Sequence, residues 1–256
     1  MHPTQLLVTA IILTKNEEAN IAEAINSVIW AAEILVVDSY STDNTVAIAQ
    51  QLGVKVLQRP FDTHARQKNW AIAQATHPWV FILDADERVP TALASEIKTI
   101  LENPAPAYVA YWIRRQNYFM GQLIRYSGWH YDRVIRLFQR DVCRYTEVQV
   151  HEEISTAGPI GQLQNKLVHH TYRGLRQYLE KWDHYTWLSA QDRGKKTDKV
   201  TLYHLGIKPV VRFFRHYIVL RGFLDGKVGF IISYMAAISV FMRYLKLWRQ
   251  QEGEKE

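Results

Sequence analysis

The sequence predicts an α/β fold in which a mostly parallel sheet is flanked by helices and followed by a helical C-terminal appendage. In the first hundred residues, short apolar runs alternate with segments whose apolar residues recur at helical spacing. Polar clusters follow three of the apolar runs, as expected where parallel strands end at one edge of a sheet. This alternation favours parallel strands joined by right-handed helical crossovers.

Each predicted element has its own local signal. Four apolar runs of strand length predict buried strands over residues 6–13, 34–37, 54–57 and 79–83. Between these runs, helical periodicity or a capping residue predicts helices over residues 21–29, 43–50 and 64–75. Gly53 follows the second helix and Pro60 follows the third strand, so both elements have a stop signal.

The later part of the chain is mixed and then helical. Residues 108–113 and 134–138 are predicted strands, and the aromatic, glycine-containing residues 119–128 are predicted to form a loop. From residue 175 onward the pattern is helical. We therefore predict one large domain followed by a helical region, with bounds at residues 1–170 and 171–256. The large domain is predicted to have two parts, residues 1–103 and 104–170.

Charge is distributed unevenly along the chain. The formal net charge is +6, which suggests an anionic partner such as nucleic acid, a phosphorylated substrate or an anionic membrane surface. Residues 1–103 carry more Asp and Glu than Lys and Arg, and the excess of basic residues lies in residues 166–249. The two halves are therefore expected to meet different partners. Cys143 is the single cysteine, which excludes an internal disulfide and fits a reducing compartment.

The most informative motif is Asp84-Ala85-Asp86, which directly follows the apolar run at residues 79–83. In an extended chain, residues i and i+2 point to the same side, so the two carboxylates converge on one spot. Ala85 is small and leaves that spot open. Two converging acids repel each other unless a cation lies between them, and a hard divalent metal such as Mg²⁺ or Mn²⁺ is the simplest occupant. A solvated turn at the strand end is the alternative.

Four motifs in order resemble a known family. They are residues 12–18 (ILTKNEE), 36–43 (VVDSYSTD), 66–69 (RQKN) and 83–87 (LDADE). Together they resemble the family 2 glycosyltransferases, and they are most similar to the lipopolysaccharide-core enzymes that add a glucosyl or heptosyl unit. The resemblance is specific over residues 6–90. It is looser afterwards, where it rests on residues 150–153, 169–170, 178–181 and 222–226.

The resemblance implies a GT-A (Rossmann-like) fold, a nucleotide-diphosphate sugar donor and a divalent metal. The residues that it implies in donor binding are Thr14, Asn16, Glu17, Asp38, Asp43, Arg66, Lys68, Asp84 and Ala85. Asp38 would accept a hydrogen bond from the nucleobase, expected to be uracil. Arg66 and Lys68 would lie near the pyrophosphate or support the nucleotide pocket. Asp86 would ligate the metal, and Asp84 would hold the metal or the ribose.

Simpler roles remain open for several of these residues. Asp38 could be a strand-end turn residue, Asp43 a helix cap, and Arg66 and Lys68 part of a solvated helix face. His170, in the pair His169-His170, is the predicted third metal ligand or phosphate contact. A structural role is the alternative for this pair.

An inverting transfer needs a general base that takes a proton from the acceptor hydroxyl, on the side of the sugar opposite the leaving group. A carboxylate from the middle of the chain is therefore expected, and Glu147, Glu152 and Glu153 are the candidates. Glu152 in His151-Glu152-Glu153 is the predicted base, because it matches the subgroup's pattern. Glu153 as the base, and an ion pair as the role of Glu152, stay open.

The C-terminal region combines apolar, aromatic and basic residues. The apolar stretch at residues 228–242 is shorter than the roughly 20 residues that span a bilayer. Basic residues and Trp248 flank it, which suits helices that lie in a membrane interface. Helices packed on the catalytic domain are the alternative. No nucleic-acid recognition motif is present, so nucleic acid is not an expected partner.

These observations predict a metal-dependent inverting glycosyltransferase that is cytoplasmic and peripheral at the inner face of the membrane. It would move a hexose, for instance glucose, from a nucleotide sugar to a glycan or glycolipid acceptor in contact with an anionic membrane. A sugar-nucleotide pyrophosphorylase is a rival, but it would want a glycine-rich loop after the first strand, where TKNE stands. A non-catalytic nucleotide-sugar-binding scaffold is the other rival.

Overall fold

The computed structural model describes residues 6–146, 153–172 and 174–253. The chain forms two compact units, which we call the sheet unit and the helical unit. The sheet unit comprises Met1–Arg115 and Arg133–His169, and the helical unit comprises Gln116–Asp132 and His170–Glu256. The segment 116–132, which the sequence analysis placed with the large domain, therefore belongs by its contacts to the helical unit.

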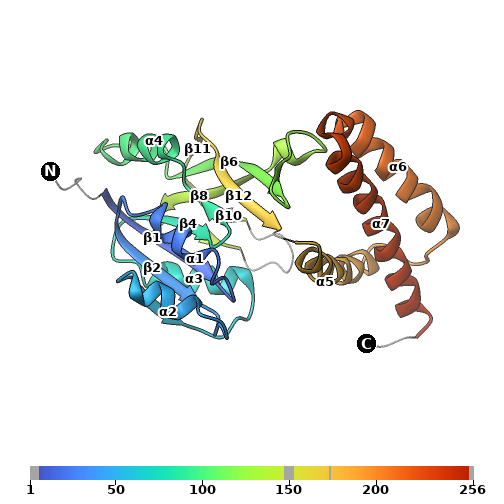
Figure 1. The fold of residues 1–256 in the computed structure, drawn as a ribbon, viewed down its shortest axis with the longest axis horizontal. Coiled ribbons are helices and arrows are strands. Elements are labelled where there is room, and N and C mark those ends of the chain that lie inside the picture. Colours follow the sequence, from blue (N-terminus) through green and yellow to red (C-terminus); the bar gives the residue numbers. More distant parts are fainter. Residues whose placement is uncertain (1–5, 147–152, 173, 254–256) are drawn as a thin grey trace. The chain divides into compact units, whose positions relative to one another are not determined.

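The first half of the sheet is parallel, with strand order β3-β2-β1-β4. Figure 1 labels three of these strands, β2, β1 and β4. Its strands are β1 (Leu6–Thr14), β2 (Ala31–Asp38), β3 (Lys55–Gln58) and β4 (Trp79–Asp84). All four lie where apolar runs predicted strands. Ile11, Ile12 and Phe81 have no exposed surface, because helices cover both faces of a parallel sheet.

Four helices pack on the sheet: α1 (Ile21–Asn26), α2 (Thr45–Gln51), α3 (His64–Ala73) and α4 (Thr91–Leu101). The first and third fall within predicted helical segments, and the second overlaps its predicted segment and ends one residue later. The fourth buries Leu93 and Ile97, four residues apart on one face, and had no counterpart in the sequence analysis. Thr63 caps α3 by accepting a hydrogen bond from the backbone N–H of Arg66.

The second half of the sheet is mainly antiparallel. Beyond β4 the strand order continues β8-β6-β12-β5, and β4 pairs antiparallel with β8, which pairs antiparallel with β6. These strands are β5 (Glu87–Arg88), β6 (Ala110–Phe119), β8 (Arg133–Gln139) and β12 (Leu167–Tyr172). β11 (Ile160–Gln162) pairs parallel with β6, and β9 (Arg144–Tyr145) forms a separate hairpin with β10 (Ile154–Ser155). The sheet is thus parallel on one side and antiparallel on the other.

The hydrophobic core of the sheet unit has one cluster on each face of the sheet. One cluster gathers side chains such as Ile12 and Phe81 from the strands with Ile97 of α4. The other joins Ile82 of β4 to Ile72 of α3. Alternate residues of one strand therefore belong to different clusters, as strand geometry requires. The packing on both faces fixes the positions of the strand ends, where the polar clusters lie.

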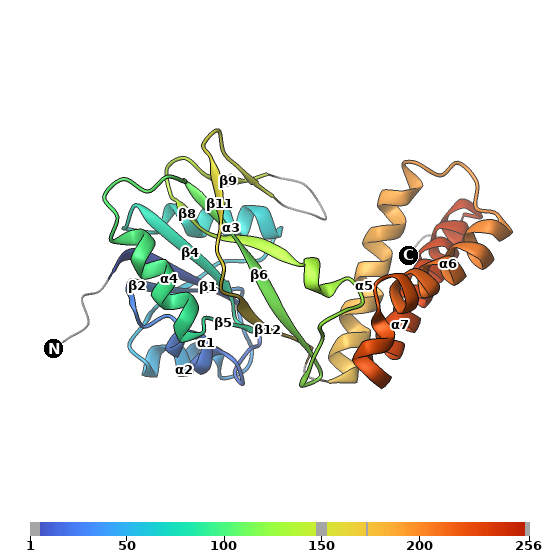
Figure 2. The same ribbon diagram turned by 90° about the horizontal axis from the view of Figure 1, so that it is seen from above.

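The helical unit is built from α5 (Leu175–Gly194), α6 (Lys208–Phe214) and α7 (Gly226–Gln251) (Figure 2). It also contains the short elements β7 (Gln122–Leu123) and η1 (Trp129–Tyr131). The π-helical segments η2 (Tyr203–Ile207) and η3 (Arg215–Val219) flank α6, and η4 (Gly222–Asp225) precedes α7. A Cβ added at Gly229 would lie 1.8 Å from the carbonyl oxygen of Gly222, so only glycine allows this close approach.

The helix α7 is longer than the apolar stretch noted in the sequence. Residues Gly222–Gln251 are long and apolar enough to cross a membrane, with a mean hydropathy of 1.6 over the most apolar window. A third of that window is buried inside the structure. Core helices of soluble proteins share the same length and composition, so this feature by itself does not assign a membrane span.

Candidate active site

The carboxyl ends of three parallel strands place the predicted donor-site residues at one edge of the sheet. Thr14 at the end of β1 is paired in register with Asp38 at the end of β2. On the other side of β1, Leu13 is paired with Asp84 at the end of β4. The three strand ends are therefore level, and their loops open at the edge where open α/β sheets bind ligands.

The loops after β1 and β2 are joined by direct hydrogen bonds. The backbone N–H of Asn16 donates to Oγ of Ser41 at 2.8 Å, and the N–H of Thr42 donates to Oδ1 of Asn16 at 2.8 Å. Asn16 and Tyr40 both adopt positive φ, 54° and 57°, which turns the two loops sharply back. The loops after β1 and β2, which carry two of the predicted motifs, are thus joined into one structured rim at this edge of the sheet.

Asp38 lies beneath this rim and is fully buried. Its carboxylate accepts hydrogen bonds from the N–H of Ser41 at 2.9 Å, from the hydroxyl of Ser41, and from Nε2 of Gln58 at 3.0 Å. In this arrangement Asp38 holds the loop after β2. These three bonds leave about one acceptor position of the carboxylate for a nucleobase.

Glu17 and Asp43 also bind the two loops together. Thr45 accepts the backbone N–H of Glu17 and donates its own hydroxyl to Asp43, at 2.8 and 2.5 Å. Asp43 accepts the N–H of Glu18 as well, at 3.1 Å. Partial burial raises the pKa of Asp43, but the hydrogen bonds from Thr45 and Glu18 outweigh it, so the pKa lies below its usual range.

Asp84 is held by an arginine from the antiparallel half of the sheet. Nη2 of Arg136, on β8, donates to the carboxylate of Asp84 and, at 2.7 Å, to Oε1 of Glu87. The side chain of Arg136 is 3% exposed and that of Glu87 is fully buried, whereas that of Asp84 is 36% exposed. Arg115 on β6 reaches the same oxygen of Glu87 at 3.4 Å. One open carboxylate and one buried carboxylate therefore share a guanidinium.

The charges around Asp84 keep it ionised. Burial raises its pKa, but Arg136, Lys68 and Arg115 together lower it well below the usual range of an aspartate. Burial likewise lowers the pKa of Arg136, and the neighbouring Asp84 and Glu87 raise it well above its ordinary value. A carboxylate thus faces the edge of the sheet at any physiological pH.

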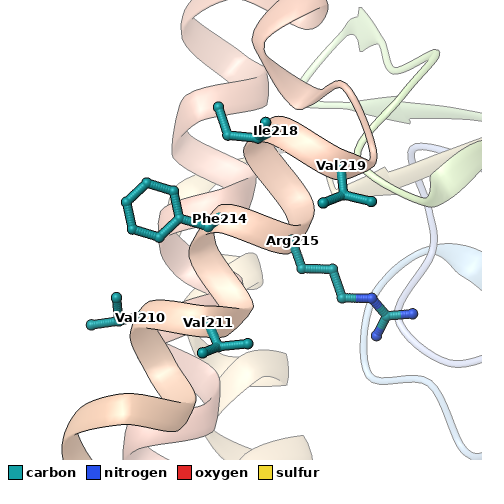
Figure 3. A pocket seen from close by; sticks show the side chains of 6 residues that line it. All are labelled: Val210, Val211, Phe214, Arg215, Ile218 and Val219. Atoms are coloured by element: carbon teal, nitrogen blue, oxygen red, sulfur yellow. The ribbon is translucent and has the colours of Figure 1, made fainter.

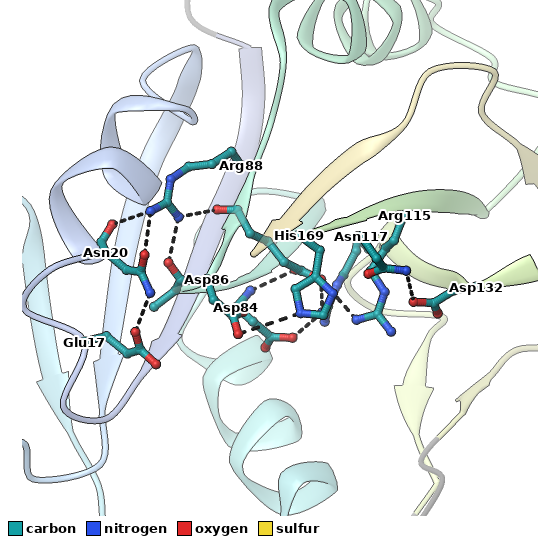
Figure 4. Close-up of polar contacts among 12 residues, drawn as sticks. Glu17, Asn20, Asp84, Asp86, Arg88, Arg115, Asn117, Asp132 and His169 are labelled. Atoms are coloured by element: carbon teal, nitrogen blue, oxygen red, sulfur yellow. Dashed lines mark hydrogen bonds and ion pairs between the residues drawn. The ribbon is translucent and has the colours of Figure 1, made fainter. Parts of the chain in front are cut away.

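Asp86 has a different neighbour. Its Oδ2 lies 3.7 Å from Nε2 of His169, on β12, and the side chains are 17% and 12% exposed (Figure 4). The turn between β4 and β5 is fixed by Arg88, which donates to the carbonyl oxygens of Ala85 and Glu87 at 2.7 and 2.8 Å. Ala85 is buried, and its N–H donates to the carbonyl of Leu13 at 3.2 Å. The Asp84–Asp86 turn is therefore rigidly attached to β1.

Arg88 also connects this turn to the first loop. Its Nη2 donates to the carbonyl and side-chain oxygens of Asn20, and Nδ2 of Asn20 donates to Glu17 at 2.5 Å (Figure 4). Glu17, which the resemblance implies in donor binding, is thus joined through Asn20 and Arg88 to the turn that carries Asp86.

The two basic residues of α3 differ in environment. Lys68 is buried, lies 4.9 Å from the ring centre of Tyr145, and contributes to the low pKa of Asp84. Arg66, two residues earlier and about half a turn away, is exposed beside the N-terminal cap of the helix. Lys68 therefore faces the carboxylates at the sheet edge, and Arg66 lies at the solvent side of the same helix.

The described residues contain no group of three or more His, Cys, Asp or Glu side chains arranged to hold a metal ion. His170, the predicted third ligand, packs its ring against Tyr118 in the helical unit, with ring centres 5.3 Å apart. It is His169 that approaches Asp86, because consecutive residues of a strand point to opposite faces.

Only part of the predicted base motif can be located. Glu147 and Glu152 lie outside the described residues. Glu153 is exposed, and its backbone pairs with Thr146 through a hydrogen bond of 2.9 Å from the N–H of Thr146. Glu152 therefore stays a prediction, in a segment that joins β9 to β10.

Three residues of this site had no predicted role: Glu87, Arg115 and Arg136. His169 was named only in the pair in which His170 was favoured. Arg136 stands in the segment VIRLF, where a cation interrupts an apolar run that the structure buries on both sides. A charge inside a buried strand must have a partner of opposite charge, so the arginine in this apolar run was the sequence signal that pointed to a buried ion pair.

Comparison with known proteins agrees with the geometry. The chain matches glycosyl transferase family 2 over residues 9–157. An uncharacterized glycosyltransferase of Rickettsia felis is 31% identical over 251 residues, covering 94% of this chain and 89% of the relative. The lipopolysaccharide core biosynthesis glycosyltransferase LpsC of Rhizobium meliloti is 29% identical over 254 residues, covering 94% of both chains.

A solved structure supports the fold over nearly the whole chain. The structure of S. aureus TarS residues 1–349 in complex with UDP-GlcNAc superposes with a TM-score of 0.52 at 15% identity, covering 96% of this chain and 92% of the other. At this identity the likeness concerns the fold, which is the GT-A fold of a glycosyltransferase.

Proposed function

The chain belongs to glycosyl transferase family 2 and is a glycosyltransferase, and from this premise we propose its reaction. It transfers a hexose, with inversion, from a UDP-linked sugar to a glycan or lipid-linked acceptor in lipopolysaccharide or cell-envelope polysaccharide synthesis. The relative LpsC, which this chain matches over 94% of both lengths, supports the acceptor class. TarS, which shares the fold, was determined with UDP-GlcNAc, so UDP is the first nucleotide to test.

The observation that carries the proposal is the level arrangement of Thr14, Asp38 and Asp84 at one sheet edge. The joined loops after β1 and β2 offer a rigid rim for the base and ribose, with Asn16 and Glu17 on one side. Lys68 is the buried cation nearest to Asp84 on α3, and it is placed to favour a diphosphate. A nucleoside diphosphate needs both a surface that holds the base and ribose and a cation near its phosphates.

Asp86 is the proposed ligand of Mg²⁺ or Mn²⁺. Among the residues that the structure describes, it is the carboxylate of the motif with no arginine contact, while Asp84 is paired with Arg136. One carboxylate and an imidazole leave most of the shell of a hard cation to diphosphate oxygens and water, which fits a metal that arrives with the donor. When bound, such a metal would offset the negative charge that develops on the leaving diphosphate.

The protein's own groups account for the remaining steps. Arg136 holds Asp84 ionised and oriented, and Arg88 holds the turn that presents Asp86. Glu152, between β9 and β10, is the proposed base that takes the proton from the acceptor hydroxyl as the new glycosidic bond forms. Rigid support of this kind keeps the donor in a reactive geometry.

A donor screen tests the function. Thermal unfolding is measured with UDP-, GDP- and ADP-sugars, with and without MnCl₂, and donor hydrolysis is followed in parallel. We expect one UDP-sugar to raise the midpoint in the presence of Mn²⁺ and to be hydrolysed slowly. Binding without hydrolysis or transfer would favour a scaffold instead.

A matched pair of variants tests the metal ligand. Asp86→Asn should abolish the Mn²⁺-dependent part of the thermal shift and lower turnover by about 10²-fold or more. Asp141→Asn, which removes an exposed carboxylate paired with Arg140, should change neither. Equal behaviour of the two variants would remove Asp86 from the metal site.

A further inference from the structure

The helical unit has an apolar face that is exposed over two turns of helix. Its six residues line a shallow hollow of about 580 Å³, and we call them the α6 face: Val210, Val211, Phe214, Arg215, Ile218 and Val219. Val210, Phe214 and Ile218 form one i, i+4 row, and the adjacent row has Arg215 between two valines (Figure 3). Each apolar member is more than half exposed.

The outward direction of this face is fixed by packing on the opposite side of the helix. Phe213 and Tyr217 stack on each other with ring centres 5.4 Å apart. Both also pack edge-on against Phe230 of α7, at 5.7 and 5.8 Å. Because this side is occupied by α7, the α6 face cannot turn inward without breaking the aromatic cluster.

Exposed apolar side chains continue beyond the α6 face in the same hairpin of helices. Ile207, Phe223, Leu224 and Ile231 are all 46–56% exposed. Proteins that stay in water rarely expose so many large apolar side chains in one short stretch, and such surfaces mark interaction sites.

The charge of this region is almost entirely positive. Residues 199–251 contain nine Lys or Arg and one carboxylate, Asp225. That carboxylate is buried, and it accepts hydrogen bonds from the backbone N–H groups of Arg125 and Tyr126 at 3.1 and 2.9 Å. It therefore holds the segment 116–132 and offers no negative charge to the surface.

Several of the cations have no carboxylate near them. Among the described residues, Arg212, Arg215, Arg221 and Lys227 form no ion pair. Nη1 of Arg212 lies 3.3 Å from Nε2 of His216 instead. Burial, with Arg215 and Arg193 nearby, lowers the pKa of Arg212, which is the direction expected where positive charge is not offset.

We propose that the α6 face docks onto an anionic lipid surface, with its apolar side chains in the interface and the surrounding cations on lipid phosphates. An apolar helix face edged by Lys and Arg is the pattern of helices that lie in a membrane interface. The cations without carboxylate partners supply the charge complementarity that an anionic leaflet needs. This inference concerns where the protein binds and does not depend on the donor or the acceptor.

A second copy of the chain fits this face less well. Two such faces would bring together cations with no exposed acid in residues 199–251 to oppose them, which disfavours self-association. A lipid surface has no such conflict, because its negative headgroups lie just outside its apolar layer. The observations therefore favour lipid as the occupant.

Vesicle sedimentation of the full-length protein tests the proposal. The vesicles contain phosphatidylcholine with about one third phosphatidylglycerol, or phosphatidylcholine alone. We expect binding to the anionic vesicles at low salt, little binding to the neutral ones, and weaker binding at about 0.5 M salt. Phe214→Ser with Ile218→Ser should lower the partition coefficient about tenfold, because two apolar side chains no longer enter the interface.

Two controls separate docking from loss of folding. Leu179→Ser changes an exposed apolar residue on α5, outside the α6 face, and should bind vesicles like the wild type. Both variants should give the same circular dichroism spectrum and the same donor-induced thermal shift as the wild type. A failure of the donor screen would leave the vesicle result intact, and the reverse also holds.

Three results would overturn the proposal. The first is equal binding of the wild type and the Phe214→Ser, Ile218→Ser variant to anionic vesicles. The second is lipid association that resists both high salt and alkaline carbonate, which would show a spanning helix in place of a docked face. The third is a stable dimer in light scattering that the double variant converts to a monomer, which would show that a second copy covers the face.

Discussion

At the scale of single residues, the candidate site depends on Arg136. Its guanidinium bridges a half-open carboxylate, Asp84, and a fully buried one, Glu87. Burying an ion pair gives little net stability, but removing one partner leaves a buried charge without compensation. Arg136 is therefore both a structural requirement and a positioning residue for the Asp84–Asp86 turn.

Replacing Arg136 with methionine should be strongly destabilising. Among the described residues, the change leaves buried Glu87 with one cationic partner, Arg115 at 3.4 Å, and with the backbone N–H of Asp84 at 3.1 Å, so we expect the free energy of unfolding in urea at pH 7 to fall by about 3–5 kcal/mol. Arg176→Met, which removes an exposed pair with Glu180, should leave the midpoint close to the wild type. A similar effect of both changes would show that Glu87 tolerates burial without Arg136.

The general base can be identified by paired substitutions. Glu152→Gln should leave the affinity for the donor unchanged and lower kcat by about 10²-fold or more, the usual scale for a general base. Glu153→Gln should have a small effect, because the side chain of Glu153 is exposed beside the β9–β10 hairpin. Steady-state kinetics with a transferable acceptor decide between them, and a reversed result would move the base by one residue.

Some residues of the candidate site can be predicted from their neighbours in the sequence, and others only from the pairing of distant strands. Asp84 and Asp86 could be predicted from the sequence because a buried strand and an acidic pair are adjacent in the chain. Arg136 lies 49 residues from Glu87, and the two meet only because β8 pairs with β4 in the antiparallel direction. His169 could not be distinguished from His170 without the register of β12, since one residue of slip exchanges their faces.

At the scale of elements, the parallel half of the sheet was predictable and the antiparallel half was less so. Apolar runs and helix signals in residues 6–83 encode strands and crossovers locally, and the structure confirms them. Strands at residues 108–113 and 134–138 were predicted, but their direction and order depend on long-range pairing. The apolar stretch noted at residues 228–242 covers only part of α7, because the helix continues through Arg243 and the polar residues that follow it.

The segment formed by α6 and η3 should make stability depend on pH. Burial, with Arg212 and Arg215 beside it, lowers the pKa of His216 to about 4. An unfolded histidine titrates near 6.5, so between pH 6.5 and 4 the unfolded state binds a proton that the folded state does not. Stability contributed by His216 is therefore complete above about pH 6.5 and falls as the pH decreases through this window.

Unfolding midpoints between pH 7 and pH 4 check this expectation. The wild type should lose stability steadily across the window, and His216→Gln should lose less, because glutamine does not titrate. The imidazole resonances of His216 should also titrate near pH 4 in NMR spectra of the folded protein. A titration near pH 6.5 would show that the histidine is solvated.

At the scale of the whole molecule, the two compact units have separate tasks in our proposals. The sheet unit presents the donor site, and the helical unit presents the α6 face. The uneven charge along the sequence anticipated different partners for the two halves. Composition alone did not identify the partner of either unit. Net charge indicates only the class of ligand, and the positions of the side chains are needed to locate the site.

Hydrogen exchange on the full chain should separate the two tasks. A UDP-sugar with Mn²⁺ should slow amide exchange at residues 14–18, 38–43 and 84–88, where the donor loops lie. Anionic vesicles should slow exchange at residues 207–219 and leave the donor loops unchanged. Protection of both regions by either ligand alone would contradict the assignment of one partner to each unit.

The shared guanidinium also has a consequence for the order of events during synthesis. Glu87 leaves the ribosome 49 residues before Arg136, the cation that its buried position needs. Until β8 has been translated and inserted beside β4, the nascent β1–β2–β4 layer can form. During that time Asp84 and Glu87 must stay hydrated, because Arg136 is not yet present. Final closure of this edge of the sheet, where the candidate site lies, is thereby deferred until the antiparallel strands arrive.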